Sequence, residues 1–123
     1  MSEYTEHKAV SNYIKTQYPN TVFTSDSSGV RLSIGNAKKM IALKSIHKIP
    51  DLIILHPNKN YHGLIIEIKD KDKSPYLKNG KLSTSKHVQE QNKTLKYLSK
   101  LGYKAVFGVG FEQCKKIIDE YFK

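Results

Sequence analysis

Residues 49–69, with the sequence IPDLIILHPNKNYHGLIIEIK, decide the fold of this chain. Residues 52–55 and 64–66 are short runs of leucine and isoleucine, which are typical of buried β-strands. The polar segment 56–60 between them contains proline and asparagine, two residues that favour turns. Strand, turn and strand together predict an antiparallel hairpin.

Charged side chains stand at one end of this hairpin. Asp51 opens the first strand directly after Pro50, and the second strand ends in Glu67, Ile68 and Lys69. Because side chains alternate across a strand, Glu67 and Lys69 share one face, and Asp51 can approach Glu67 from the neighbouring strand. Two carboxylates ~4 Å apart repel by roughly 1 kcal/mol in water and ~4 kcal/mol at an effective dielectric of 20. The arrangement therefore calls for a cation, which a divalent metal beside Lys69 would supply.

The pattern of Pro50-Asp51 followed by Glu67-Ile68-Lys69 resembles the P-D…(D/E)-x-K motif of the restriction-endonuclease-like nucleases. Downstream, HVQEQ at residues 87–91 and LGY at residues 101–103 resemble the VRR-NUC branch of that superfamily. The resemblance runs from about Glu3 to the C-terminus. It implies a single α/β domain over residues 1–123, with a restriction-endonuclease-like core in which a mixed central β-sheet is flanked by α-helices. One departure is Lys48, where many relatives have a glycine.

The resemblance also implies a metal site and roles for its residues. Asp51 and Glu67 would be the direct ligands of Mg²⁺ or Mn²⁺, with the backbone carbonyl of Ile68 as a third ligand. Such a hard cation prefers oxygen ligands and keeps several waters. Lys69 would orient the attacking water and stabilise the charge that develops on phosphorus. Gln91 would hydrogen-bond the metal's water or a substrate phosphate.

A further acid is expected from the first helix, which we predict to follow Ser2 and to end near Gln17. In the resemblance, one acid of this helix leans towards the metal or orders its water shell, and Glu6 is our choice. The alternative is that Glu3 and Glu6 only complement the dipole of the helix. With Glu6, the candidate catalytic residues are Asp51, Glu67, Lys69, Gln91 and Glu6.

The net charge of +10 and the pI of about 9.6 indicate a polyanionic partner. A membrane-surface role is a weaker interpretation than nucleic-acid binding, because the positive charge does not lie opposite a broad apolar helix face. The sequence has no apolar run of ~18 residues and no signal-peptide layout, so we expect no membrane partner and a cytoplasmic location. The single cysteine, Cys114, is expected to be a buried structural thiol.

Basic residues gather upstream of Asp51. Residues 36–44 predict a short helix with Met40, Ile41 and Leu43 facing inward. The lysines of this region are interpreted as phosphate contacts rather than as a solvated face, and Arg31 as the best candidate for a fixed bidentate contact. The candidate nucleic-acid-binding residues are Arg31, Lys38, Lys39, Lys44 and Lys48.

The other elements follow from local patterns. Residues 21–24 predict a strand, and residues 26–29 predict a turn that leads to residues 30–32. Asn79-Gly80 within residues 76–84 predicts an exposed hairpin, either a substrate-gripping or dimer-contacting insertion or an inert loop. A helix through Leu101, a strand at residues 103–109 and a last apolar-striped helix complete the chain.

These features predict a metal-dependent DNA endonuclease, with DNA as its partner, in the replication, repair or recombination of phage or host DNA. The resemblance implies branched, flapped or junction DNA as substrate, a homodimer, and the host cytoplasm if the protein is phage-encoded. The alternative is a non-catalytic basic module that binds nucleic acid. The sequence favours the nuclease, because a pure binder has no reason to place Asp51, Glu67 and Lys69 in a metal-site arrangement.

Overall fold

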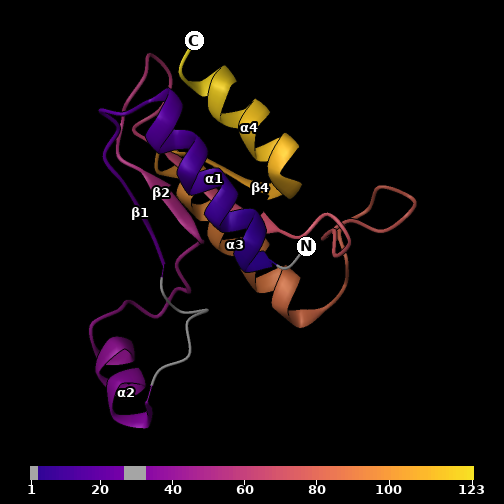
Figure 1. Cartoon of the computed structure of the whole chain (residues 1–123). Helices are drawn as coiled ribbons and strands as arrows, with labels where there is room; N and C mark the ends of the chain where they lie inside the picture. Colours follow the sequence, from indigo (N-terminus) through magenta and orange to yellow (C-terminus); the bar gives the residue numbers. More distant parts are fainter. Residues whose placement is uncertain (1–2, 27–32) are drawn as a thin grey trace.

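The computed structural model describes residues 3–26 and 33–123, which form four helices packed around or beside a four-stranded sheet (Figure 1). In chain order the elements are α1 (Glu3–Gln17), β1 (Phe23–Ser25), α2 (Ile34–Ala42), β2 (Leu52–Ile54), β3 (Leu64–Lys69), α3 (Lys86–Lys100), β4 (Lys104–Val109) and α4 (Gly110–Tyr121). No helix within the described ranges is long and apolar enough to cross a bilayer.

The strands follow one another across the sheet in the order β1-β2-β3-β4. β2 and β3 pair antiparallel, with Leu52 opposite Ile66, so the predicted hairpin is confirmed. β4 lies parallel to β3 and joins it through α3, because two parallel strands need a long crossover connection. The predicted mixed sheet flanked by helices is therefore confirmed.

Each face of the sheet has its own hydrophobic core. Ile66 and Ile68 point to the face covered by α1 and α4, where Val10, Ile14 and Ile118 complete the larger cluster. The opposite face carries a smaller cluster beneath α3, made of Ile65, Leu95, Ala105 and Phe107. Figure 1 shows α1 and α4 on one side of the sheet and α3 on the other. β3 is buried at all six of its positions, so polar side chains on this strand are held inside the protein.

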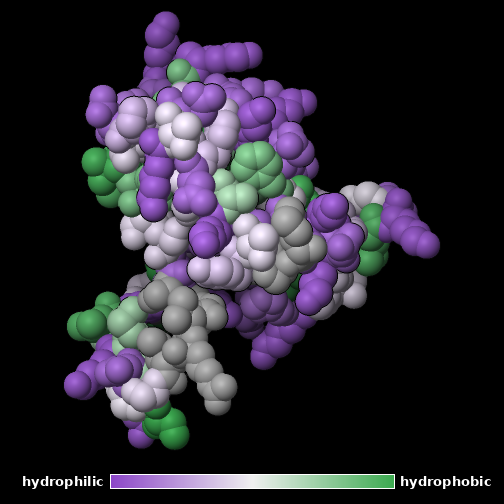
Figure 2. Space-filling model, viewed as in Figure 1, coloured by the Kyte–Doolittle hydropathy of each residue, from purple (hydrophilic) through white to green (hydrophobic). Residues whose placement is uncertain are grey.

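The expectation that Met40, Ile41 and Leu43 face inward is wrong. α2 spans Ile34–Ala42 rather than residues 36–44, and it buries none of its residues. Ile41 is 73% exposed and Leu43 is 83% exposed. Figure 1 shows α2 apart from the sheet, and Figure 2 shows apolar atoms on its surface. The spacing of the apolar residues correctly predicted a helix with an apolar side, but such spacing does not predict whether another part of the chain covers that side.

The predicted hairpin at residues 76–84 forms, with one antiparallel bridge between Tyr76 and Leu82. Gly80 has a φ of 82°, the left-handed conformation that the asparagine–glycine turn requires. β1 begins and ends slightly later than the predicted strand at residues 21–24. Residues 27–32, which hold most of the predicted turn at 26–29 and the segment after it, lie outside the described residues.

α1 and α4 are joined by a polar cluster that makes stability depend on pH. The hydroxyls of Tyr13 and Tyr18 both donate to Oδ1 of Asp119 at 2.6 Å. These hydrogen bonds lower the pKa of Asp119, and the same bonds raise the pKa of Tyr13 and raise that of Tyr18 to about 12. The cluster is intact only while both phenols are protonated and the carboxylate is ionised.

We expect thermal stability to fall at both ends of the pH scale because of this cluster. The stabilisation from Tyr18 is present below its ordinary pKa of 10 and is lost as the pH rises towards about 12. That from Asp119 is present above its ordinary pKa of 3.8 and is lost as the pH falls through the lowered value. Melting curves of the wild type and of Tyr18→Phe should differ by a few degrees at neutral pH and converge above pH 12. A difference that persists unchanged at that pH would contradict this account.

Candidate active site

Asp51 stands at the start of β2, directly after the fully buried Pro50. Its carboxylate Oδ2 accepts a hydrogen bond from the backbone N–H of Ile68 at 2.9 Å. Its backbone carbonyl accepts the N–H of Asp26 at 2.9 Å. A hydrogen bond on each side therefore fixes the acid that opens β2, and one of them holds its carboxylate against the backbone of β3.

Glu67 and Lys69 lie on β3, on the face covered by α3. The register pairs Leu52 with Ile66, and the next position of each strand brings Asp51 beside Glu67. Glu67 is 6% exposed and Lys69 is 8% exposed, so both charged side chains are buried. A charge is costly to bury unless it meets an opposite charge or a bound ion. The structure thus brings the predicted acids and the predicted lysine together at one end of the hairpin.

Gln91 comes to this region from α3. In the loop between α3 and β4, the N–H of Tyr103 donates to the carbonyl of Leu98. The C-terminal end of α3 therefore lies where β3 and β4 begin, and its first turns lie near the opposite ends of those two parallel strands. Gln91 is only 8% exposed, and its Nε2 lies 3.0 Å from Nε2 of His87. Its Oε1 is buried with no hydrogen-bond partner among the described residues. A buried amide oxygen without a donor is costly, and it marks a place where a water or a ligand is expected.

Glu6, on α1, is almost fully buried, at 1% exposure. Its Oε2 accepts the backbone N–H of Phe111 at 2.5 Å, in the first turn of α4. A carboxylate there complements the dipole of α4, a role that neither sequence interpretation included. Glu6 also lines a cleft of about 360 Å³ with Lys71 and Gly110. Glu3 is the first residue of α1, and its side chain lies outside the described residues.

Cys114 lies on α4, in the larger hydrophobic core. The thiol is fully buried, and its pKa is raised to about 12 by burial first and then by the negative charges of Glu6 and Asp51. It therefore stays protonated and inert, as expected of a structural cysteine. The Cys114 sulfur packs closely against β4, where a Cβ added at Gly108 would lie 2.5 Å from it. The close packing leaves Glu6 and Asp51 near the same thiol.

The predicted phosphate-binding residues are spread over the α2 region. Lys38 and Lys39 lie on α2 and are exposed, as is Lys48. Lys44 instead forms an ion pair with Asp26, its Nζ 2.8 Å from Oδ1. Arg31 lies outside the described residues. The structure therefore connects one of these lysines to the candidate active site, through the same Asp26 that bonds to Asp51.

Asp26 and His87 were not identified from the sequence. Asp26 is a buried carboxylate whose backbone pairs with Asp51, and only the register of β1 against β2 reveals this. His87 is four residues before Gln91, the spacing at which side chains meet on a helix, and that signal could have been read.

The side chains of the candidate site that could hold a cation offer oxygen atoms. The described residues contain no group of three or more histidine, cysteine, aspartate or glutamate side chains arranged to hold a metal. Asp51 and Glu67 supply two carboxylates in register, and Gln91 brings a buried oxygen without a donor. One or two carboxylates completed by water and phosphate is the ligand set that Mg²⁺ prefers. The donor set therefore fits the predicted Mg²⁺ or Mn²⁺.

The fold and this cluster define a class of protein: a small α/β domain with a mixed sheet and an acid–acid–lysine cluster at one end of its central hairpin. No protein-family model matches the sequence, and no curated protein matches it. Among solved structures, the chain is similar to one described as a VRR_NUC domain protein, with a TM-score of 0.67 and 24% sequence identity. The match covers 98% of this chain and 88% of that one. The chain therefore has the fold of a VRR-NUC domain.

Proposed function

We propose that this protein is a metal-dependent DNA endonuclease that hydrolyses phosphodiester bonds. The observation that carries the proposal is the arrangement of Asp51, bonded to the Ile68 backbone, in register with the buried Glu67 and beside the buried Lys69. The fold shared with a VRR_NUC domain protein and the net charge of +10 support the same conclusion. Burying Glu67 and Lys69 beside the half-buried Asp51 costs stability, so a function is the simplest reason to retain them.

Asp51, Glu67 and the carbonyl of Ile68 would hold Mg²⁺ or Mn²⁺. When bound, such an ion polarises a phosphate oxygen and lowers the pKa of a bound water. The Ile68 N–H bond restrains the Asp51 carboxylate through one of its two oxygens. That restraint fixes the orientation of the acid before substrate arrives, which is how preorganised sites avoid reorganisation during the reaction.

Lys69 and Gln91 would act on the reacting groups themselves. The Lys69 ammonium donates to a nonbridging oxygen of the scissile phosphate and stabilises the charge that grows there. The unpartnered Oε1 of Gln91 accepts a hydrogen bond from the attacking water and fixes its orientation. Glu6 would order the water shell from α1 while it anchors α4 through Phe111.

The substrate we propose is branched, flapped or junction DNA, in the replication, repair or recombination of phage or host DNA. The candidate contacts are lysines and one arginine that would bind phosphates, which carry no direct sequence information, so recognition would depend on the shape of the backbone rather than on base sequence. Lys38, Lys39 and Lys48, which are exposed, and Arg31 would contact phosphates around the site.

The proposal is tested by incubating the purified protein with labelled duplex, single-strand, flap and four-way-junction DNA in Mg²⁺, in Mn²⁺ and in EDTA. We expect cutting in either metal, none in EDTA, and a preference for a branched substrate. Binding should weaken by ~10³ to 10⁵ between roughly 50 and 200 mM salt if about 6–10 phosphates are contacted. Binding without cutting of any substrate would replace the nuclease by a non-catalytic nucleic-acid-binding module.

We further propose a homodimer, because a four-way junction presents two equivalent strands to cut. The exposed apolar side chains of the α2 region, Ile41, Leu43 and the 99%-exposed Ile46, are a surface that a second copy would cover.

Replacing these three side chains with glutamine should give a monomer, because they bury nothing within the protomer and their loss should not unfold it. Light scattering coupled to size exclusion should report about 28 kDa for the wild type, twice the chain mass of 14.1 kDa, and 14.1 kDa for the variant. The matched control replaces three other exposed apolar residues, Val22, Leu55 and Leu101, with glutamine. A wild-type mass of one chain would dismiss the dimer.

A further inference from the structure

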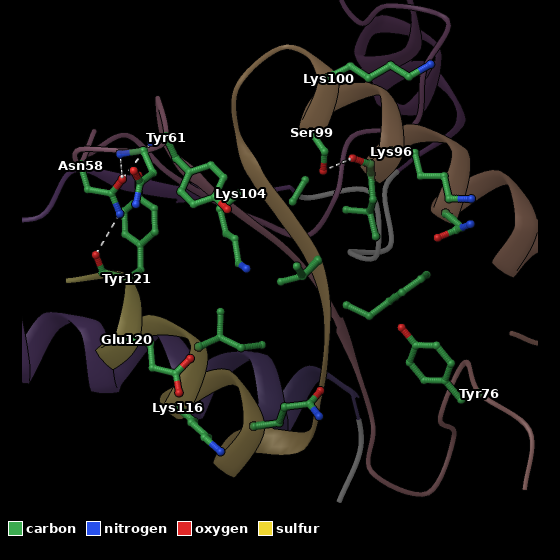
Figure 3. A pocket seen from close by; sticks show the side chains of 18 residues that line it. Asn58, Tyr61, Tyr76, Lys96, Ser99, Lys100, Lys104, Lys116, Glu120 and Tyr121 are labelled. Atoms are coloured by element: carbon green, nitrogen blue, oxygen red, sulfur yellow. Dashed lines mark hydrogen bonds between the residues drawn. The ribbon is translucent and has the colours of Figure 1, made fainter. Parts of the chain in front are cut away.

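A groove runs along the open edge of the sheet, away from the acids. β4 is the last strand in the sheet order, and beyond it lies a cavity of about 820 Å³ between α3 and α4. Figure 3 looks onto this edge. Side chains from both faces of β4 line the cavity, Ala105 and Phe107 on the α3 side and Lys104 and Val106 on the α4 side. The groove therefore straddles the strand edge.

Positive charge surrounds the groove. Lys96 and Lys100 come from α3, Lys104 from β4 and Lys116 from α4, and the one acid among the lining residues is Glu120. Figure 3 shows Lys104 reaching into the space between the two helices, with Lys116 on the α4 wall. Lysines on three different elements that converge on one hollow produce a local positive potential, which concentrates an anionic ligand there.

Aromatic rings lie at both ends of the same groove. Tyr76 is 48% exposed and packs edge-on against Phe107, with their ring centroids 6.2 Å apart. At the other end the ring centroids of Tyr61 and Tyr121 are 6.3 Å apart, and Lys104 Nζ lies 5.7 Å from the centre of the Tyr61 ring. Rings that line a basic groove are the features that proteins use to hold single-stranded nucleic acid, by stacking bases while cations follow the backbone.

Asn58 makes the Tyr61 end of the groove rigid. Its Oδ1 accepts the N–H groups of Asn60 and Tyr61 at 2.9 Å, and its Nδ2 donates to the carbonyl of Tyr121 at 3.1 Å. The Tyr121 hydroxyl donates to the carbonyl of His56 at 2.6 Å. These bonds set the two rings in place without a ligand, so a base would meet a preformed surface and lose less conformational entropy on binding.

The open edge of β4 could also accept another β-strand. Two copies of this chain that paired through β4 would place the lysines of both grooves around one two-fold axis, and like charges so close oppose association. An apolar peptide would leave the same lysines uncompensated. Charge therefore favours a polyanion, and the exposed ring of Tyr76 with the half-buried ring of Tyr61 favours one whose bases are unpaired, because a duplex keeps its base faces stacked internally.

We propose that this groove binds a single-stranded arm of nucleic acid, with phosphates on Lys96, Lys100, Lys104 and Lys116 and bases against Tyr76 and Tyr61. The inference rests on the proposed nuclease function, since it names the part of the substrate that lies beyond the cut. Phe107, which lines the groove, is the parallel partner of Glu67 on the adjacent strand. A strand in the groove would thus lead towards the candidate active site.

The test measures binding rather than cutting. The anisotropy of a labelled oligothymidylate is followed in EDTA with the Asp51→Asn protein, which is not expected to cut. In one variant Lys96, Lys100 and Lys116 become glutamine. In the control, Lys8, Lys15 and Lys123, exposed residues outside the groove, undergo the same change. Both variants lose three positive charges, so a difference between them reports position and not net charge.

We expect the groove variant to bind the oligothymidylate on the order of 10- to 100-fold more weakly than the control variant. The slope of log affinity against log salt should fall by about 2, because each phosphate of a single strand contributes ~0.7. Tyr76→Leu should weaken binding by about 5- to 100-fold through lost stacking, whereas Tyr76→Phe retains the ring and the affinity. Unchanged melting temperatures would show that these variants fold.

Three results would overturn the inference. The first is equal binding by the two lysine variants, and the second is an unchanged affinity in Tyr76→Leu. The third is a competition result in which polyglutamate displaces the labelled oligothymidylate as effectively as unlabelled oligothymidylate does. That result would make the groove a site for acidic peptides. The nuclease proposal fails independently, if the wild type cuts no substrate in either metal. The groove inference stands in that case as long as the variants differ in binding.

Discussion

Replacing Asp51 with asparagine should abolish metal-dependent cutting while DNA binding is largely retained. The bound metal is expected to supply several kcal/mol of transition-state stabilisation, and each 1.36 kcal/mol is a factor of ten in rate. We therefore expect the cleavage rate to fall by ~10³-fold or more. Asparagine keeps an oxygen that can accept the Ile68 N–H bond, so the variant removes the charge at nearly constant shape. Single-turnover cleavage of a flap or junction substrate in saturating Mg²⁺ measures the effect.

A matched control for this variant is Asp72→Asn, which makes the same chemical change at an exposed residue shortly after β3. It should cut at close to the wild-type rate. Melting curves should show both variants folded. A wild-type rate in Asp51→Asn would remove Asp51 from the reaction, and an equal loss in both variants would point to net charge instead of the site.

Sequence alone could predict the part of the site that depends on nearest-neighbour geometry. The alternation of side chains along β3 put Glu67 and Lys69 on one face, and the antiparallel hairpin let Asp51 approach Glu67, in agreement with the register of β2 against β3. The role expected of Gln91 came from the family resemblance, and the structure shows that its side chain is buried on α3. These are relationships within a few residues or across one hairpin, where local rules are strong.

Contacts between distant segments could not be predicted in that way. The contact between Asp26 and Asp51 depends on how β1 pairs with β2. The apolar residues of α2 are likewise not buried in the part of the chain that the structure describes. The β4 groove is a further case, because its lysines come from α3, β4 and α4 and are far apart in the sequence. The local sequence pattern predicts each helix or strand by itself, but the tertiary fold determines which of these elements come into contact.

Lys69 offers a second large effect, because its contribution to stability and its contribution to catalysis should be separable. The side chain is 8% exposed on a strand that is buried at every position. Lys69→Met removes the charge and nearly preserves the volume, but it leaves the buried Glu67 without this neighbouring cation, so some loss of stability is expected. If Lys69 were only structural, the cleavage rate should fall only as far as the loss of folded protein explains.

We expect Lys69→Met instead to lower the cleavage rate by ~10² to 10³-fold, the loss typical of one preorganised electrostatic donor. Lys69→Arg should not restore the rate, because a planar guanidinium cannot take the place of a compact ammonium in a buried site. The decisive comparison sets cleavage rates beside melting temperatures for the wild type and both variants. A rate that falls while the melting temperature holds would assign Lys69 to the reaction. A rate that tracks the melting temperature would assign it to the fold, because the charge would then matter only through the native state it helps to form.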